Sequence, residues 1–278
     1  MMKKAKAKIF LTAILILSVG LMAACGGSSA HTRVVVSGST SVQPYVEVLA
    51  EEFLLLHPTE EVDVQGGGSS AGIMAVESGI ADIGMSSRPL KKDEQHLWVI
   101  EIAKDGLAMI IHPRNMVHNL TLEQVRRIYT GEIQNWEELG GVSAKIHIIA
   151  REEGSGTRGA FEELVMGESR ISPRAIVQSS NGAVRQLVSG DPNAIGFISL
   201  GLVDESIRAV SLDGVAATAE NVTDGSYSLY RPFLFIAEEK PAETAAQFIN
   251  FILSPEGKEH MRREGLVPTV RGGIDEEI

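Results

Sequence analysis

Three short turns in this sequence combine glycine with serine or threonine. They are residues 37–41 (SGSTS), 66–70 (GGGSS) and 154–157 (GSGT). Glycine lets the backbone approach a ligand closely, and the hydroxyls add hydrogen-bond donors. Each turn is expected at the end of a strand and the start of a helix, where free N–H groups and a partial positive charge attract anions. One such turn would be typical of any helix start, but three of them predict an anion site.

Two arginines stand beside such segments. Arg151 directly precedes the third turn, where its guanidinium could give a tetrahedral oxyanion two parallel N–H donors. The alternative for Arg151 is a surface ion pair with Glu152 or Glu153. A fourth segment, residues 84–89 (GMSSRP), adds two serine hydroxyls and a second arginine, although an ordinary polar loop explains it equally well.

Two of these glycine-rich segments also match the consensus sequences of enzyme motifs. Residues 154–159 match the dinucleotide fingerprint G-x-G-x-x-G, which also needs an acid about 20 residues further on, at the end of the next strand. That strand runs into Ser179, Ser180 and Asn181, with no acid, so the sequence does not favour a dinucleotide-binding dehydrogenase. Residues 68–72 match the nucleophile elbow G-x-S-x-G, with Ser70 as the nucleophile. No histidine lies in a recognisable motif, so a serine hydrolase stays only as an alternative.

No cofactor and no metal is predicted. The chain has neither a phosphate-binding Walker motif nor a histidine pair with the spacing of a zinc-binding helix. The histidines are interpreted as surface or core residues. We therefore expect a binding protein without enzymatic activity.

The first 24 residues have the pattern of a secretory signal peptide. Residues 1–8 carry four lysines and no acid, and residues 9–24 are apolar or small, a run too short for a permanent membrane span of about 20 residues. Cys25, the only cysteine, stands where the bacterial lipobox places its lipidated cysteine, although Met22 departs from the usual leucine. We expect removal of residues 1–24, lipidation of Cys25 and a tether over residues 25–32; plain signal cleavage is the alternative.

Charge excludes one class of partner. The whole chain has a net charge of −11, and loss of residues 1–24 leaves 21 basic and 36 acidic residues, a net charge of −15. Nucleic acid requires a basic surface, so it is not an expected partner. An anion site is still compatible with this charge, because salt screens distant surface charges while directed donors act at contact distance.

The rest of the chain alternates strand and helix patterns. Four short β-rich runs, each followed by apolar residues at helical spacing, predict parallel sheets covered by helices on both faces; they are residues 33–37, 62–65, 145–150 and 175–178. Two longer extended segments, residues 106–115 and 227–237, break this rhythm. They suit a two-domain protein with paired crossovers, or else two ordinary strands of one sheet. A late helix is expected over residues 255–263, with Ser254 as its N-cap.

Taken together, these residues resemble the phosphate-binding proteins of bacterial phosphate ABC transporters, within the periplasmic-binding-protein superfamily. The matching stretches follow the family's order and cover nearly all of the mature chain: residues 36–41 (VSGSTS), 66–72 (GGGSSAG), 82–90 (DIGMSSRPL), 119–136 (NLTLEQVRRIYTGEIQNW), 151–157 (REEGSGT) and 193–201 (NAIGFISLG).

The resemblance implies an α/β, two-domain, type II-like binding-protein fold, each domain a mainly parallel sheet flanked by helices, with two crossover segments. Domain I would comprise residues 33–110 and 233–278, and domain II residues 111–232. It also implies a monomer, lipid-anchored on the extracytoplasmic face of the cell membrane (periplasm or exterior). There it would bind inorganic phosphate between its domains and deliver it to the permease subunits of an ABC importer.

Carried over by position, the resemblance also implies the phosphate-binding residues: Ser39, Thr40, Ser41, Ser69, Arg151, Ser155, Gly156 and Thr157. Ser87 and Arg88 complete the expected set. Some family members have an aspartate at the position of Ser87, where it accepts the proton of hydrogen phosphate and so distinguishes phosphate from sulfate. We expect Arg88 or the hydroxyls to replace that contact. A receptor for sulfate or molybdate, or an adhesion or signalling protein with the same fold, stays as an alternative.

Overall fold

The computed structural model describes residues 33–276. The predicted signal peptide, the tether and the lipidation site Cys25 lie outside these residues. Within them, no helix is both long enough and apolar enough to cross a membrane.

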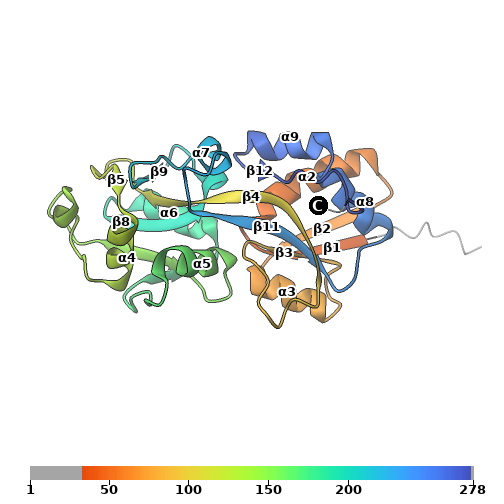
Figure 1. The fold of residues 1–278 in the computed structure, drawn as a ribbon, viewed down its shortest axis with the longest axis horizontal. Coiled ribbons are helices and arrows are strands. Elements are labelled where there is room, and N and C mark those ends of the chain that lie inside the picture. Colours follow the sequence, from red (N-terminus) through yellow and green to blue (C-terminus); the bar gives the residue numbers. More distant parts are fainter. Residues whose placement is uncertain (1–32, 277–278) are drawn as a thin grey trace, which may run out of the picture. The chain divides into compact units, whose positions relative to one another are not determined.

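The first third of the described chain alternates strands and helices (Figure 1). Strand β1 is followed by helix α2, strand β2 by helix α3, and strand β3 by the long strand β4. Their bounds are β1 Arg33–Gly38, α2 Gln43–Leu56, β2 Glu61–Gly66, α3 Ser69–Glu77, β3 Ile83–Ser86 and β4 Trp98–Ile111.

The middle of the chain repeats this alternation and ends in β8, a strand that the apolar spacing did not predict. The elements are β5 Asn119–Leu120, α4 Leu122–Thr130, a 3-10 turn Trp136–Leu139, β6 His147–Arg151, α5 Gly156–Phe161 continued by a π-helical turn Glu162–Met166, β7 Ile176–Gln178, α6 Asn181–Gly190 and β8 Ala194–Ser199.

The last part of the chain begins with short elements and returns through a second long strand, β11. The elements are a 3-10 turn Leu200–Leu202, β9 Arg208–Ala209, β10 Ser211–Leu212, α7 Ala219–Thr223, β11 Tyr230–Ala237, α8 Glu243–Ile252, α9 Pro255–Arg263 and β12 Val267–Pro268. Ser254 caps α9 as predicted, since its hydroxyl accepts a hydrogen bond from the amide of Gly257.

The main sheet has the strand order β2-β1-β3-β11-β4-β8-β6-β7. As expected, β1 is parallel to β2 and β3, and β6 is parallel to β7 and β8. The two long strands differ, because β11 and β4 pair antiparallel with each other and with their outer neighbours. The predicted extended segment at 106–115 begins earlier in the structure, at Trp98, and ends at Ile111.

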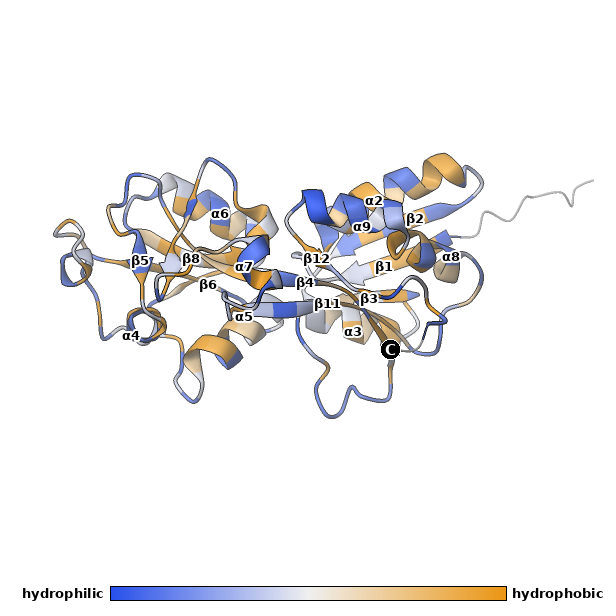
Figure 2. Ribbon diagram, turned by 45° about the horizontal axis from the view of Figure 1, so that its top comes forward, coloured by the Kyte–Doolittle hydropathy of each residue, from blue (hydrophilic) through white to orange (hydrophobic). Residues whose placement is uncertain are grey.

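The apolar side chains form separate cores along the long strands. Ile100, Ile102 and Ala103 of β4 pack with residues of β1, α2 and α8 in one core, whereas Leu107 and Met109 of the same strand pack with α4, β6 and β8 in another. Hydrophobic and hydrophilic residues alternate along helices such as α2 and α6 (Figure 2), as expected for helices that bury one face against a sheet.

Close packing of α3 on β1 depends on Gly72. A β-carbon at this position would lie 2.5 Å from the carbonyl oxygen of Ser37 and 2.7 Å from the α-carbon of Gly38. Both are backbone atoms, which cannot rotate away. The absence of a side chain at position 72 therefore lets the helix approach the strand end that carries the first turn.

Replacing Gly72 by alanine should lower the free energy of unfolding by about 2 kcal/mol, because the added methyl group forces the helix off the strand. Gly190→Ala is the matched control, since nothing lies within 4 Å of its β-carbon position at the end of α6. Urea denaturation monitored by circular dichroism measures both variants. Equal stability of the two variants would contradict this account of the packing.

Candidate oxyanion-binding site

Three serine hydroxyls meet where β1, α3 and β3 come together. The Ser39 hydroxyl donates to Ser87 Oγ at 2.9 Å, and Ser69 Oγ lies 3.4 Å from Ser87 Oγ. The backbone N–H of Ser87 donates to Ser69 Oγ at 3.0 Å. All three serines are buried. The structure thus gathers the first two predicted turns and the predicted segment around residue 87 into one cluster.

The third predicted turn lies against this cluster. Thr157 Oγ1 and Ser41 Oγ are 2.8 Å apart, and the amide of Ser70 donates to the carbonyl of Gly154 at 3.1 Å. A β-carbon on Gly156 would lie 2.2 Å from Ser69 Oγ and 2.6 Å from Ser87 Oγ. A side chain at position 156 would force both hydroxyls to move and would also press on the backbone of Ser87, 3.0 Å away, so glycine favours this approach of α5 to the serine cluster.

Arg151 lies at the end of β6 and is 1% exposed. Its Nη2 donates to Thr40 Oγ1 at 3.2 Å, and its Nη1 lies 3.5 Å from Thr157 Oγ1. On its other side, Glu152 accepts hydrogen bonds from Nε and Nη2 at 3.0 and 2.9 Å. The ion pair with Glu152 that was given as an alternative is therefore present. It orients the guanidinium, which at the same time contacts the hydroxyls of Thr40 and Thr157.

Asn181 was missed in the sequence analysis. Its Nδ2 donates to Ser41 Oγ at 2.9 Å and to Thr40 Oγ1 at 3.2 Å, and the residue is buried. It is the first residue of α6, directly after the Ser180 N-cap. The sequence pattern could have revealed Asn181, because the junction between the end of β7 and the start of α6 is of the same kind as the three strand-to-helix turns that were selected.

A second arginine–carboxylate pair was also missed. Arg231 of β11 donates to Asp105 of β4, and its Nη2 reaches Ser41 Oγ at 3.0 Å. Asp105 Oδ1 accepts a hydrogen bond from the Ser199 hydroxyl at 2.7 Å. The available signal was a pair of opposite charges at the long apolar segments: Asp105 directly precedes the predicted segment 106–115, and Arg231 lies inside the segment 227–237.

The predicted site residue Arg88 forms an ion pair with a neighbouring carboxylate. Its Nη1 and Nη2 donate to Glu94 at 2.7 and 2.8 Å, and further bonds reach the carbonyl of Pro89 and the hydroxyl of Ser70. These hydrogen bonds from Arg88 are the largest cause that holds the pKa of Glu94 below its usual value. The pair closes the loop that follows Ser87 and so holds that serine in place.

Two further residues have local roles in the structure. Ser155, a predicted site residue, is buried and caps α5, its hydroxyl accepting from the amide of Arg158 at 3.2 Å. Ser70 accepts a hydrogen bond from Arg88 at 3.3 Å. A nucleophilic serine needs an adjacent general base, and a guanidinium, which stays protonated, cannot serve as one, so the partner of Ser70 in the structure does not support the serine hydrolase.

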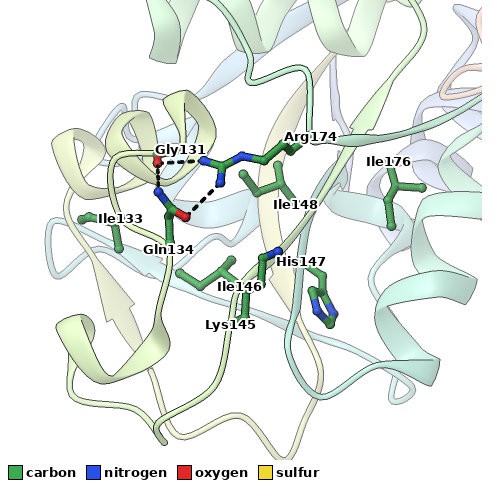
Figure 3. A pocket seen from close by; sticks show the side chains of 9 residues that line it. All are labelled: Gly131, Ile133, Gln134, Lys145, Ile146, His147, Ile148, Arg174 and Ile176. Carbon is green, nitrogen blue, oxygen red and sulfur yellow. Dashed lines mark hydrogen bonds between the residues drawn. The ribbon is translucent and has the colours of Figure 1, made fainter.

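A separate cavity of about 90 Å³ contains none of the predicted site residues (Figure 3). Four of its nine lining residues are isoleucines, and Arg174 at its side donates to Gln134 and to the carbonyl of Gly131. No group of three metal-ligating side chains occurs between residues 33 and 276. The concentration of buried hydroxyls and arginines at the turns therefore defines the candidate site.

The site and the fold define a class of binding protein. The model of the PBP superfamily domain matches residues 26–256, which is most of the chain. The chain belongs to this superfamily.

Particular relatives are similar over most or all of their length. A candidate phosphate ABC transporter substrate-binding protein from Clostridium perfringens, solved with bound phosphate, is 44% identical with a TM-score of 0.83, covering 86% of this chain and all of that one. An ABC-type phosphate transport receptor from Vibrio cholerae is 40% identical with a TM-score of 0.70, covering 84% and 99%. The phosphate-binding protein PstS of Bacillus subtilis is 29% identical over 87% of this chain and 83% of its own. The resemblance inferred from the sequence motifs is confirmed.

The Arg88–Glu94 pair leads to a prediction about pH. Because the folded-state pKa of Glu94 is below its ordinary value of 4.5, the pair stabilises the fold above that value, and this contribution is lost as the pH falls through the lower folded-state pKa. Glu94→Gln should lower the free energy of unfolding at neutral pH by roughly 3 kcal/mol and weaken its dependence on acid pH. Urea denaturation over a pH series measures both effects.

Glu123→Gln is the control for this comparison. Glu123 forms an ion pair with Arg126 whose side chains are 62% and 35% exposed, so its loss should cost about 0.5 kcal/mol or less. If Glu94→Gln behaved like Glu123→Gln, the Arg88–Glu94 pair would have no structural role.

Proposed function

We propose that this chain is an extracytoplasmic lipoprotein that binds inorganic phosphate and delivers it to the permease of an ABC importer. The observation that carries the proposal is the 2.8 Å approach of Ser41 Oγ and Thr157 Oγ1, which joins the first and third turns in one buried cluster. The solved relative from Clostridium perfringens holds phosphate, which supports the same class of ligand here.

The chemistry of the cluster suits a tetrahedral oxyanion. Its proposed ligand atoms are the hydroxyls of the predicted serines and threonines and the guanidinium of Arg151, all of which can donate to an oxyanion. Several of these groups contact one another, so they lie close together. The acidic net charge does not prevent binding, because these donors act at contact distance. The role requires binding and release only, without catalysis.

Ser87 is the residue that bears on selectivity. A hydroxyl can accept a hydrogen bond as well as donate one, so Ser39, Ser69 and Ser87 offer acceptors for the hydrogen bond that the P–O–H group of hydrogen phosphate donates. Sulfate is fully ionised and has no proton to donate. We propose that these hydroxyls take over the part of the aspartate found in some relatives, and that Arg88 supports them by holding the loop after Ser87.

We also propose the two-domain division stated above, with residues 33–110 and 233–278 in one domain and 111–232 in the other. The two separate cores support a division of this kind, although they change over at residues 104–106 of β4, so that Leu107 and Met109 of the proposed first domain pack in the second core. The first and third turns would then belong to different domains, and a ligand bound by both would favour the closed arrangement.

Gly156→Ala should weaken phosphate binding by about tenfold or more, because the new methyl group would collide with Ser69 and Ser87 and hold the third turn away. Gly154→Ala is the matched control two residues earlier, since its β-carbon position is 3.8 Å from the nearest atom, ordinary contact. Isothermal titration calorimetry with phosphate measures both affinities.

The same titrations decide the ligand. Phosphate should bind much more tightly than sulfate or molybdate to the unaltered protein. Sulfate binding as tightly as phosphate would contradict the phosphate assignment, and equal effects of the two glycine substitutions would contradict the proposed approach of the third turn.

Anchoring through Cys25 is proposed from the lipobox-like sequence at the predicted cleavage site. Cys25→Ser should move the exported protein from the membrane fraction to the soluble fraction, since a serine hydroxyl cannot receive the thioether-linked lipid. Fractionation of cells that express each form, followed by immunoblotting, tests this. Continued membrane association of the serine variant would argue for another attachment.

A further inference from the structure

Arg231 and Asp105 face each other across the two long strands. They are direct partners in the antiparallel register of β11 and β4, and their side chains are 1% and 0% exposed. A buried ion pair has to compensate the loss of hydration of both charges, so it contributes little stability compared with apolar residues of similar size. Stability alone therefore does not explain this pair.

The carboxylate fixes the orientation of the guanidinium. Asp105 Oδ2 accepts from Nε and Nη2 of Arg231 at 3.2 and 3.1 Å, while Oδ1 is held by Ser199. In this orientation Nη2 also donates to Ser41 Oγ at 3.0 Å. The remaining nitrogen, Nη1, is buried without a hydrogen-bond partner among residues 33–276.

Two guanidinium groups therefore flank the hydroxyls that join the turns. Arg231 contacts Ser41, Arg151 approaches Thr157, and the two hydroxyls are 2.8 Å apart. Each guanidinium is also paired with a carboxylate, Arg151 with Glu152 and Arg231 with Asp105. Their remaining N–H groups face the hydroxyls of Ser41 and Thr157, and these directed donors would favour the more negatively charged form of a tetrahedral ligand.

We propose that Arg231, oriented by Asp105, is a positioning residue of the oxyanion site that places Ser41 and makes the site select the doubly charged form of phosphate. This inference rests on the proposed function and names the ionisation state of its ligand. The ion pair presents its positive end toward Ser41 and its negative end toward Ser199.

The charged and titratable groups around Arg231 are Asp105 from β4, Arg151 from β6 and Tyr45 from α2. Burial raises the pKa of Tyr45 well above its usual value, so this phenol stays neutral. Burial also raises the pKa of Asp105, and the ion pair with Arg231 and the bond from Ser199 oppose that rise.

Counting protons on binding tests the inference. Calorimetric titrations with phosphate below its second pKa, in two buffers of different ionisation enthalpy, give the number of protons exchanged. Selection of the dianion requires that the unaltered protein release protons as it binds. The double variant Arg231→Gln with Asp105→Asn, which keeps a neutral hydrogen-bonding pair, should bind about tenfold more weakly or worse and release fewer protons.

The matched control is Arg185→Gln with Asp204→Asn, which neutralises an exposed pair at 3.0 Å and conserves net charge in the same way. Its affinity and proton release should equal those of the unaltered protein. Arg231→Lys, which keeps the charge, should retain the proton release and serves as the second variant if the double variant does not fold.

The outcomes separate this inference from the proposed function. Failure of the unaltered protein to bind phosphate would overturn the proposed function. Phosphate binding without proton release by the unaltered protein would overturn the selection of the dianion. Unchanged affinity and proton release in the double variant would remove Arg231 from the site.

Discussion

Burial of polar groups is the constraint on which the rest of this structure depends. A hydroxyl removed from water costs about 1–3 kcal/mol if it finds no partner, and a charged guanidinium costs more. Ser41, Ser69 and Ser87 are fully buried, and Arg151 nearly so. Their hydrogen-bond partners come from turns far apart in the sequence, so no single turn supplies all the partners that its own buried groups need. The fold around the site has to bring strand ends, helix starts and the glycines between them into contact.

The two long strands connect this polar cluster to the apolar cores. Along β4 the chain passes from one hydrophobic core to another, and the passage occurs around Asp105, opposite Arg231 on β11. The same strand pair that joins the cores thus places a guanidinium against Ser41. In a binding protein that closes on its ligand, the strand pair β4–β11 would then both join the two cores and contribute to the ligand-binding site.

Much of this arrangement could be predicted from local sequence. The glycine–serine turns, Arg151 and the strand–helix rhythm are local patterns, and each has a direct physical reason to occur at a strand end. The pairing of Arg231 with Asp105 is different, because it depends on the register between two strands more than 100 residues apart. Strand β8 escaped prediction for a related reason: it is buried on all sides, so it has no alternation of apolar and polar residues to reveal it.

The central claim is that turns from distant parts of the chain bind one oxyanion together. A crystal structure of the protein with phosphate tests it most directly. The account predicts a single phosphate within hydrogen-bond distance of Arg151, Thr157 and the hydroxyls of residues 39–41. A phosphate bound elsewhere, such as in the cavity beside Arg174, or held by only one of the turns, would contradict it.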